Sequence, residues 1–199
     1  MALPGAGLAC ASVDSPPGRT PAMWLIPLVS FAWGFLEATC FFIVPDVWLT
    51  WIVLSDGKRA CRQAVWALAG ALVGGTVVYL WGSLHPEQAA LLTLVPGIGP
   101  EMVAGVAEDL QRSGGMALLI GPLKGIPYKL YAFHSSRTVG FIPFILISIP
   151  ARLSRFLAVT GFAWFVSRAV LGGTSARNRK VCLVLCWVVF YVFYFSVMP

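Results

Sequence analysis

Six charged side chains lie inside or at the edge of apolar stretches of this sequence, and their types and spacing point to binding of an anion. They are Glu37, Asp46, Lys124, Lys129, Arg152 and Arg155. A charge near the centre of a bilayer costs about 2.5 to 3.5 kcal/mol on insertion scales, so such charges must pair, extend to an interface or line water. Four of the six are basic, and Arg and Lys both suit binding of phosphate. A cavity that held all six would attract an anion such as a lipid phosphate.

The two lysines belong to the segment P-L-K-G-I-P-Y-K-L, in which Gly125 and Pro127 interrupt the backbone between them. A short helix that starts after Pro127 would present free backbone N–H groups to the same anion. The lysines would then neutralise a phosphate or a partner acid, while Gly125 and Pro127 let the chain turn back.

The two arginines, Arg152 and Arg155, are three residues apart, so they share one face of a helix. Two facing hairpins would make it easy for them to pair with the acids Glu37 and Asp46. We therefore expect the acids and bases to meet in one wet cavity with surplus positive charge.

A purely structural interpretation stays open for each of these charges. Lys129 and Arg137 can extend to a membrane interface. Arg152 can lie at a helix start just after Pro150, and Glu37 can be a hydrogen-bonding residue of a packed bundle. The combination of Glu37 with the two arginines favours the functional interpretation, because an intramembrane ion cluster is by default a functional hypothesis.

The composition places the chain in the membrane class. Of its 199 residues, 58% are hydrophobic and 11% are charged, whereas soluble domains are about half apolar and about a quarter charged. Mean hydropathy is +0.82, and the many aromatic residues fit the enrichment of aromatics at bilayer interfaces. The net charge is +6, and the basic residues lie between apolar runs. We therefore interpret them as residues that set the membrane topology and attract anionic lipid headgroups. We predict no nucleic-acid partner.

The patterns that indicate an enzyme are missing from the sequence. There is no nucleophile–base pair or nucleotide-binding loop, and neither His85 nor His134 has an obvious Ser or Asp partner. Cys182 and Cys186 are one helical turn apart, but no His, Asp or Glu accompanies them as a further metal ligand. We therefore predict a protein that is not an enzyme and that uses no cofactor or metal.

Five apolar regions organise the chain. Gln63–Gly82 and Val181–Met198 are about long enough to span a hydrocarbon core, and Phe144–Leu171 is a third candidate span that carries arginines. The regions 23–54 and 116–142 are broken by proline beside charge. Broken backbone at membrane depth is tolerated only where protein or a cavity surrounds it, so we expect two re-entrant hairpins that face one another.

The expected fold is an all-α integral membrane protein with about three spanning helices, two facing re-entrant helical hairpins and one amphipathic surface helix. We predict the amphipathic helix over Glu101–Arg112, after a loop at 83–100. Residues 1–22 are rich in Pro, Gly, Ala and Ser, which predicts a disordered tail. The rest of the chain, 23–199, is then a single membrane domain. Its core lies at about 24–170, and a final spanning helix follows at 181–198.

Basic residues predict the orientation. If Gln63–Gly82 and Phe144–Leu171 each span once, seven Lys and Arg residues lie on one side, against Arg112 and Arg137 on the other. The seven are Lys58, Arg59, Arg62, Arg168, Arg177, Arg179 and Lys180. The side rich in Lys and Arg should be cytoplasmic, and the C-terminus then faces outward.

Small residues in the first span predict close helix packing. Gly70 and Gly74 lie one turn apart within Gln63–Gly82, and small residues at this spacing let two helices approach closely. The same helix is where we would expect a homo-oligomer to form.

Four stretches carry a family likeness. They are G-F-L-E-A-T-C-F-F-I-V-P-D at 34–46, A-L-A-G-A-L-V-G-G-T-V-V-Y-L-W-G at 67–82, G-I-P-Y-K-L-Y-A at 125–132 and P-F-I-L-I-S-I-P-A-R-L-S-R-F at 143–156. Together they resemble the DedA/VTT (SNARE-associated) superfamily of membrane proteins, and within it the YqaA-like branch. The most specific part is I-P-Y-K followed by R-x-x-R-F.

The resemblance implies two facing re-entrant hairpins, with acids and arginines needed for activity, in a multi-pass protein of the bacterial inner membrane. On the matching positions, Glu37 and Asp46 are the acids of the first hairpin. Lys129 is the lysine of the second, and Arg152 and Arg155 lie on the helix that follows. Members of the superfamily are linked to movement of phospholipids or polyprenyl phosphates between leaflets.

We therefore predict a transport protein that moves a phosphate-bearing lipid between leaflets through a charged groove, with membrane lipids as its partners. Two alternatives stay open. One is a proton-coupled transporter of a small solute or ion, acting through Glu37, and the other is a non-catalytic membrane scaffold. Lipid exchange distinguishes the first function from both alternatives, and a scaffold would tolerate Glu37→Gln.

Overall fold

The computed structural model describes residues 22–40 and 43–197 of the chain. The predicted disordered tail at 1–22 lies, except for Ala22, outside the described residues. Residues 41–42 of the first predicted hairpin and residues 198–199 also lie outside them.

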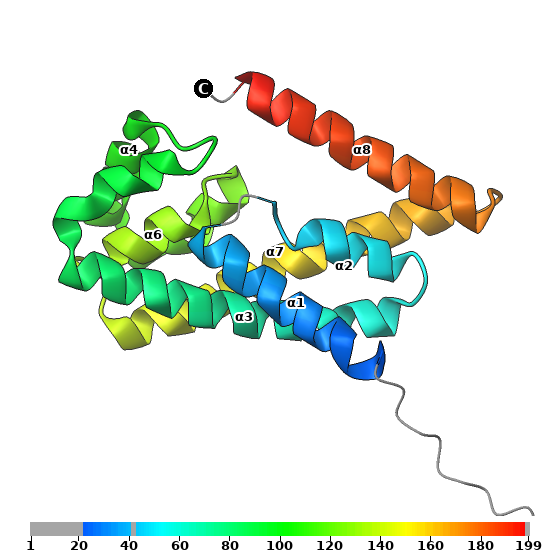
Figure 1. The fold of residues 1–199 in the computed structure, drawn as a ribbon, viewed down its shortest axis with the longest axis horizontal. Coiled ribbons are helices and arrows are strands. Elements are labelled where there is room, and N and C mark those ends of the chain that lie inside the picture. The colour runs from blue at the N-terminus through cyan, green and yellow to red at the C-terminus, as the bar shows by residue number, and fades with distance from the viewer. Residues whose placement is uncertain (1–21, 41–42, 198–199) are drawn as a thin grey trace, which may run out of the picture.

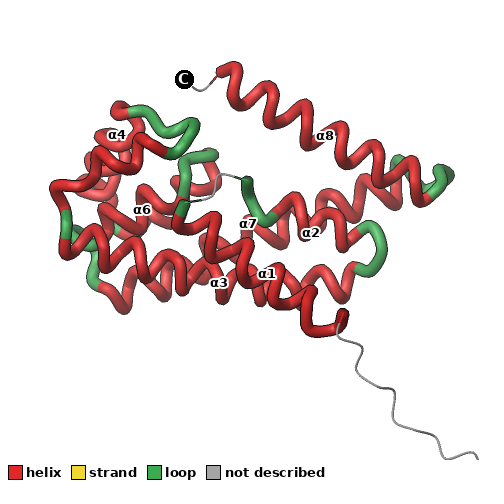
Figure 2. The backbone as a smooth tube through the Cα atoms, viewed as in Figure 1, coloured by secondary structure: helices red, strands yellow, loops and turns green. Residues whose placement is uncertain are grey.

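The regular elements of the described residues are all helices (Figure 1 and Figure 2). In chain order they are α1 (Ala22–Thr39), α2 (Asp46–Val53), α3 (Gly57–Leu84), the 3-10 helix η1 (Pro86–Leu94), α4 (Pro100–Ser113), α5 (Gly115–Ile120), the 3-10 helix η2 (Gly121–Lys124), α6 (Tyr128–Ser135), α7 (Phe141–Ala169) and α8 (Ala176–Val197).

Three helices in the described part of the chain, α3, α7 and α8, are long and apolar enough to cross a membrane. α3 has 28 residues and α7 has 29, and at about 1.5 Å per residue both exceed a hydrocarbon core of about 30 Å. The predicted all-α architecture with about three candidate spans is confirmed at this level, and the chain is a membrane-embedded protein.

Two of the predicted spans, Gln63–Gly82 and Val181–Met198, start too late, because their helices begin earlier in the sequence. α3 begins at Gly57, since the side chain of Asp56 caps it by accepting a hydrogen bond from the backbone N–H of Arg59 at 3.0 Å. α8 also begins earlier than predicted, and the hydroxyl of Ser175 accepts a backbone N–H of its first turn at 3.3 Å. Most of the basic residues that the orientation argument placed on one side therefore lie in the first turns of α3 and α8.

The segment 83–100, predicted as a loop, contains η1, which Pro86 opens from the first helical position. The predicted helix at Glu101–Arg112 corresponds to α4. Its Val106 and Leu110 are buried, while its charged residues are exposed. Its placement on a membrane surface stays a prediction.

The two regions predicted to be broken are divided into short elements. The first consists of α1 and α2, separated at 40–45, and the second of α5, η2 and α6. In the second region the backbone of Gly125 has a φ of 88°, a left-handed conformation that favours glycine. A new helix, α6, begins at Tyr128 directly after Pro127, as the sequence indicated.

Glycines let the backbones of α1 and α3 pack directly against each other. A Cβ added at Gly70 would lie 1.9 Å from the carbonyl oxygen of Phe31, and one added at Gly34 would lie 2.0 Å from that of Ala67. No side chain fits at such distances, so the two backbones touch because both residues are glycine. The close packing predicted from Gly70 and Gly74 thus occurs within the chain, and a homo-oligomer through α3 stays a prediction.

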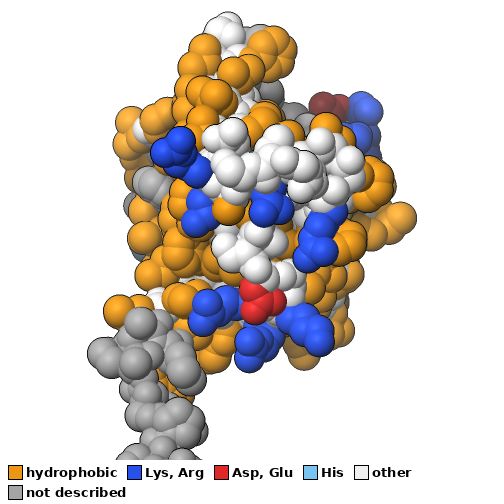
Figure 3. Space-filling view, turned by 90° about the vertical axis from the view of Figure 1, so that its right-hand side faces the viewer, with side chains coloured by type: hydrophobic (Ala, Val, Ile, Leu, Met, Phe, Trp, Pro, Cys, Tyr) orange, Lys and Arg blue, Asp and Glu red, His pale blue; other side chains and the backbone are white. Residues whose placement is uncertain are grey.

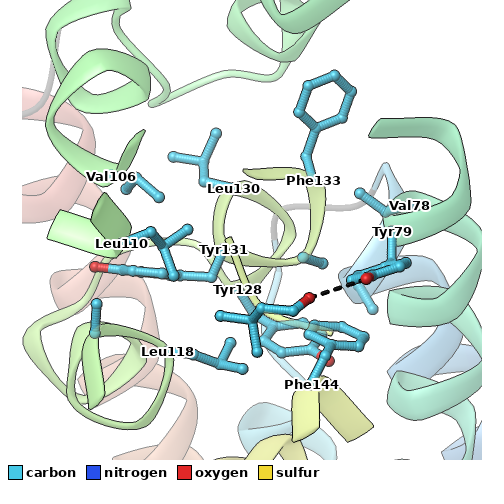
Figure 4. Packing of buried hydrophobic residues seen from close by; sticks show 14 of the residues in the cluster. Val78, Tyr79, Val106, Leu110, Leu118, Tyr128, Leu130, Tyr131, Phe133 and Phe144 are labelled. Carbon is cyan, nitrogen blue, oxygen red and sulfur yellow. Dashed lines mark hydrogen bonds between the residues drawn. The ribbon is translucent and has the colours of Figure 1, made fainter. Parts of the chain in front are cut away.

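The main core lies around α6, which is almost wholly buried between α3, α4 and α7. Figure 4 shows Tyr128 beside Phe144, with their rings stacked at 6.2 Å between centroids, and Tyr79 of α3 close by. The hydroxyl of Tyr79 donates to the carbonyl of Val139 at 2.9 Å (dashed in Figure 4). This core holds α6 against α7 and so positions the residues of the break that precedes α6.

One end of the molecule is strongly basic. The α2–α3 and α7–α8 connections both lie at the right-hand end in Figure 1. Figure 3 views this end directly and shows Lys and Arg side chains gathered on it, above flanks that are mostly hydrophobic. The seven Lys and Arg residues that the sequence analysis placed on one side of the membrane belong to the ends of α3, α7 and α8 that meet here. Its assignment to the cytoplasm stays a prediction.

Candidate functional site

Two ion pairs connect the first broken region to α7. Glu37, in the last turns of α1, accepts hydrogen bonds from both terminal nitrogens of Arg152, with Nη1 to Oε1 at 3.1 Å. Asp46, the first residue of α2, accepts hydrogen bonds from Arg155 through Oδ2, with Nε at 3.1 Å and Nη2 at 2.8 Å. The spacing explains the match. Arg152 and Arg155 are one helical turn apart on α7. Glu37 and Asp46 are nine positions apart, but the chain reverses between α1 and α2, so each acid can reach one of the two arginines.

The two arginines have different surroundings. Arg152 is fully buried, and its guanidinium lies over the rings of Tyr128 at 4.7 Å and Phe156 at 5.0 Å. Such stacking stabilises a desolvated cation in addition to its ion pair. The side chain of Arg155 keeps 16% of its area exposed and faces the cavity described next. Arg152 is thus held in place on all sides, whereas Arg155 can reach a ligand.

A cavity of about 730 Å³ lies between the body of the protein and α8. Five of the six charges predicted from the sequence line it, and we call these five the charged floor. They are Glu37, Asp46, Lys124, Lys129 and Arg155. Arg152 does not line the cavity but pairs with Glu37, which does, and its predicted role in ligand binding stays a prediction.

The two lysines of the charged floor differ in exposure. Lys129, in the first turn of α6, is 2% exposed and interacts electrostatically with Glu37. Lys124, at the end of η2, is exposed. The break at 125–127 therefore separates one buried lysine from one accessible lysine at the same cavity.

The remaining walls are apolar and aromatic. α7 presents a stripe that includes Val159, Phe162 and Val166, and α8 presents Trp187 and Tyr191 among others. Many of the exposed large hydrophobic residues belong to these two helices. The cavity therefore combines a charged floor with walls that suit hydrocarbon.

Sequence reasoning did not identify the residues of α8 that line the cavity. The indole of Trp187 donates to the hydroxyl of Thr50 at 3.0 Å, and the hydroxyl of Tyr191 accepts the backbone N–H of Val44 at 3.1 Å. The signal was present, since Trp187, Tyr191 and Tyr194 are aromatic residues with polar tips at helical spacing. The sequence analysis assigned the aromatic residues to the bilayer interfaces, and that interpretation does not predict that α8 packs next to the site.

Within the described residues, no group of three or more His, Cys, Asp or Glu side chains is placed so that it could bind a metal ion. The chemistry that the cavity offers is binding of an anion by Lys and Arg, next to acids that balance part of the charge.

Comparison with known proteins found a protein of similar sequence. An uncharacterized protein of Haemophilus influenzae is 26% identical over 172 residues, which cover 85% of this chain and 83% of that protein. No family model matches the chain, and no solved structure matches it. The resemblance to the DedA/VTT superfamily therefore stays a hypothesis.

Proposed function

We propose that the protein moves a phosphate-bearing lipid, a phospholipid or polyprenyl phosphate, between the leaflets of a membrane. One observation carries the proposal, the charged floor within a cavity whose other walls are apolar helices. A lipid has the same two-part character, because its phosphate needs cations and its tails need hydrocarbon. A small hydrophilic solute has no apolar part that would gain from contact with the exposed hydrophobic walls of α7 and α8.

The proposal includes two re-entrant hairpins, α1–α2 and α5–α6, as the DedA/VTT resemblance implies. Their short helices support this arrangement. α2 and α6 have eight residues each, about 12 Å of helix, and a hydrocarbon core is about 30 Å thick. Such short elements at membrane depth must be surrounded by protein or line a cavity, and both hairpins contribute residues to the charged floor.

Arg155 is the proposed phosphate ligand. It donates the N–H of Nε and one N–H of Nη2 to Asp46, so the N–H groups of Nη1 and the second N–H of Nη2 can bind phosphate oxygens. Lys129 and Lys124 line the same cavity and supply further positive charge. Asp46 stays paired with Arg155 while the phosphate is bound. Its negative charge weakens the attraction between Arg155 and the phosphate, so the phosphate can be released.

The tails follow the apolar stripe of α7. Phe162 on this stripe is 69% exposed, so a lipid can keep its tails in the surrounding bilayer while its phosphate lies on the charged floor. The charges then replace the water that the phosphate loses, which lowers the barrier to crossing.

A liposome assay tests the proposal. Purified protein in vesicles of phosphatidylethanolamine and phosphatidylglycerol should speed leaflet exchange of a fluorescent phosphatidylglycerol, followed by quenching from outside. The double variant Asp46→Asn/Arg155→Gln keeps a neutral hydrogen-bonded pair in place of the ion pair and should lose at least about tenfold in rate, equal to about 1.4 kcal/mol. Arg168→Gln, on an exposed turn of the same helix, is the matched control and should exchange lipid normally.

The outcomes separate the candidate functions. Wild-type exchange by the double variant rejects Arg155 as the phosphate ligand. Solute flux driven by a pH gradient, without lipid exchange, indicates the proton-coupled transporter. The absence of any flux, together with a normal cellular role for the double variant Asp46→Asn/Arg155→Gln, indicates a scaffold.

A further inference from the structure

The cavity extends well beyond the charged floor, along the facing sides of α7 and α8. On α7 its lining residues run from Arg155 to Ser167, and on α8 they run from Tyr191 back to Arg179. In each stretch the last residue lies twelve positions from the first, which is about 18 Å of helix. Ser167 is near the end of α7 and Arg179 is in the first turn of α8, so both belong to the part of the cavity toward the α7–α8 connection, which lies at the basic end (Figure 1).

Arg179 differs from its basic neighbours on the first turn of α8. It is half-buried and lines the cavity, whereas Arg177 is exposed and does not line it. The ammonium group of Lys180 lies over the ring of Trp51 at 5.0 Å, outside the cavity lining. One base of this turn is therefore directed to the cavity, and the others have different surroundings.

We propose that Arg179 is a headgroup-binding residue at the mouth of the cavity, where it binds the phosphate of a lipid from the leaflet at the basic end before that phosphate reaches Arg155. This inference rests on the proposed function and extends it by a second anion site. Arg155 precedes Ser167 by twelve positions, about 18 Å along α7, and Arg179 follows the connection beyond Ser167, so one phosphate is not expected to contact both arginines. The path therefore has two successive positions.

The lining between these positions favours a lipid over a free anion. It is largely apolar, with Ala163, Val166 and Leu183 on facing helices, and Ser167 and Thr50 are the hydroxyl side chains along it. Free inorganic phosphate gains nothing from apolar walls, whereas the tails of a lipid gain contact with them while its phosphate is held by an arginine. The occupant we infer is thus an anionic phospholipid.

The first test compares Arg179→Gln with Arg177→Gln, which remove the same charge from the same turn of α8. Exchange of fluorescent phosphatidylglycerol is measured in proteoliposomes over a series of phosphatidylglycerol fractions. Arg179→Gln should lower the rate about tenfold at low fractions and recover towards the wild-type rate at high fractions, because it weakens capture and leaves the later step intact. Arg177→Gln should match the wild type, and Arg179→Lys should restore much of the lost rate.

The second test reads out binding through a native thiol. Cys182 lines the cavity three residues after Arg179, on the same helix face. With the other four cysteines replaced by Ser, phosphatidylglycerol in detergent micelles should slow labelling of Cys182 in the wild type and in Arg177→Gln, but not in Arg179→Gln. Inorganic phosphate at the same concentration should give no protection.

Each outcome decides one of the two ideas. If the wild type exchanges lipid and Arg179→Gln behaves like Arg177→Gln in both tests, the inference about Arg179 is overturned while the proposed function stands. If the wild type exchanges no lipid but protection of Cys182 still depends on Arg179, the headgroup site stands and the proposed function fails. Protection by inorganic phosphate alone overturns the assignment of a lipid as the ligand.

Discussion

Arg152 donates hydrogen bonds to both carboxylate oxygens of Glu37 and so joins the end of α1 to the middle of α7. Both side chains are buried. Buried ion pairs add little net stability compared with apolar residues, but breaking one partner alone is costly. This pair therefore positions the helices that carry the charged floor, and the neighbouring Asp46–Arg155 pair faces the cavity.

Removing the charge of Glu37 should weaken the fold. Glu37→Gln leaves the guanidinium of Arg152 buried without its counter-ion, which should lower the free energy of unfolding by about 3 to 5 kcal/mol. Denaturant unfolding in detergent measures this change. Arg112→Gln, which breaks the exposed pair with Glu108 (2.6 Å), should cost less than about 1 kcal/mol. A Glu37→Gln protein as stable as the wild type would contradict the positioning role.

The same substitution at two glycines should have opposite effects. Gly70→Ala drives a methyl group into the backbone of Phe31 and should destabilise the protein by about 1 to 3 kcal/mol. Gly105→Ala lies on an open part of α4 with nothing within 4 Å, and should stabilise the helix by about 0.5 to 1 kcal/mol. Melting temperatures of the two variants check this, and a stable Gly70→Ala protein would argue against the close α1–α3 contact.

Two hydrogen bonds should hold α8 over the cavity. Trp187→Phe with Tyr191→Phe keeps an aromatic ring at each position but removes the bonds to Thr50 and Val44, each worth about 0.5 to 1.5 kcal/mol. We expect Cys182 to react with a thiol reagent at least about fivefold faster, because the cavity opens more often. Phe193→Leu is the control, since Phe193 is exposed and does not line the cavity. Unchanged labelling would show that other contacts hold α8.

The predicted orientation can be tested by labelling from one side of the membrane. In a variant without native cysteines, Gly105→Cys on α4 should react with a membrane-impermeant reagent in intact bacterial cells. Gly173→Cys, in the α7–α8 connection at the basic end, should react only after the cells are permeabilised, because Lys and Arg favour the cytoplasmic side. The reverse pattern would invert the topology.

Several elements followed directly from local patterns. The spans of α3 and α7, the helix at α4 and the break before α6 were predicted from apolar length, proline and glycine alone. Errors concentrated at helix ends, where one side chain decides the outcome. Asp56 extends α3 outward by capping it, and such a cap depends on the local backbone conformation as well as on residue type.

The candidate site was predictable in part. Six charges were selected because each is costly in an apolar stretch, and the structure gathers them in one region. The sequence does not distinguish Arg152 from Arg155, because both lie on one helix face. The structure separates them, since Tyr128 and Phe156 enclose one guanidinium and the cavity receives the other.

By itself, the sequence determined that this is a helical membrane protein, which segments are long enough to span, and which charges need partners. These properties follow from composition summed along a short stretch of chain, since the cost of placing a residue in hydrocarbon is local. Only the tertiary structure decided that Glu37 meets Arg152, that Asp46 meets Arg155, and that α8 closes a cavity with Arg179 at its mouth. Those contacts depend on the rotation and register of helices distant in sequence, which packing of the whole chain sets.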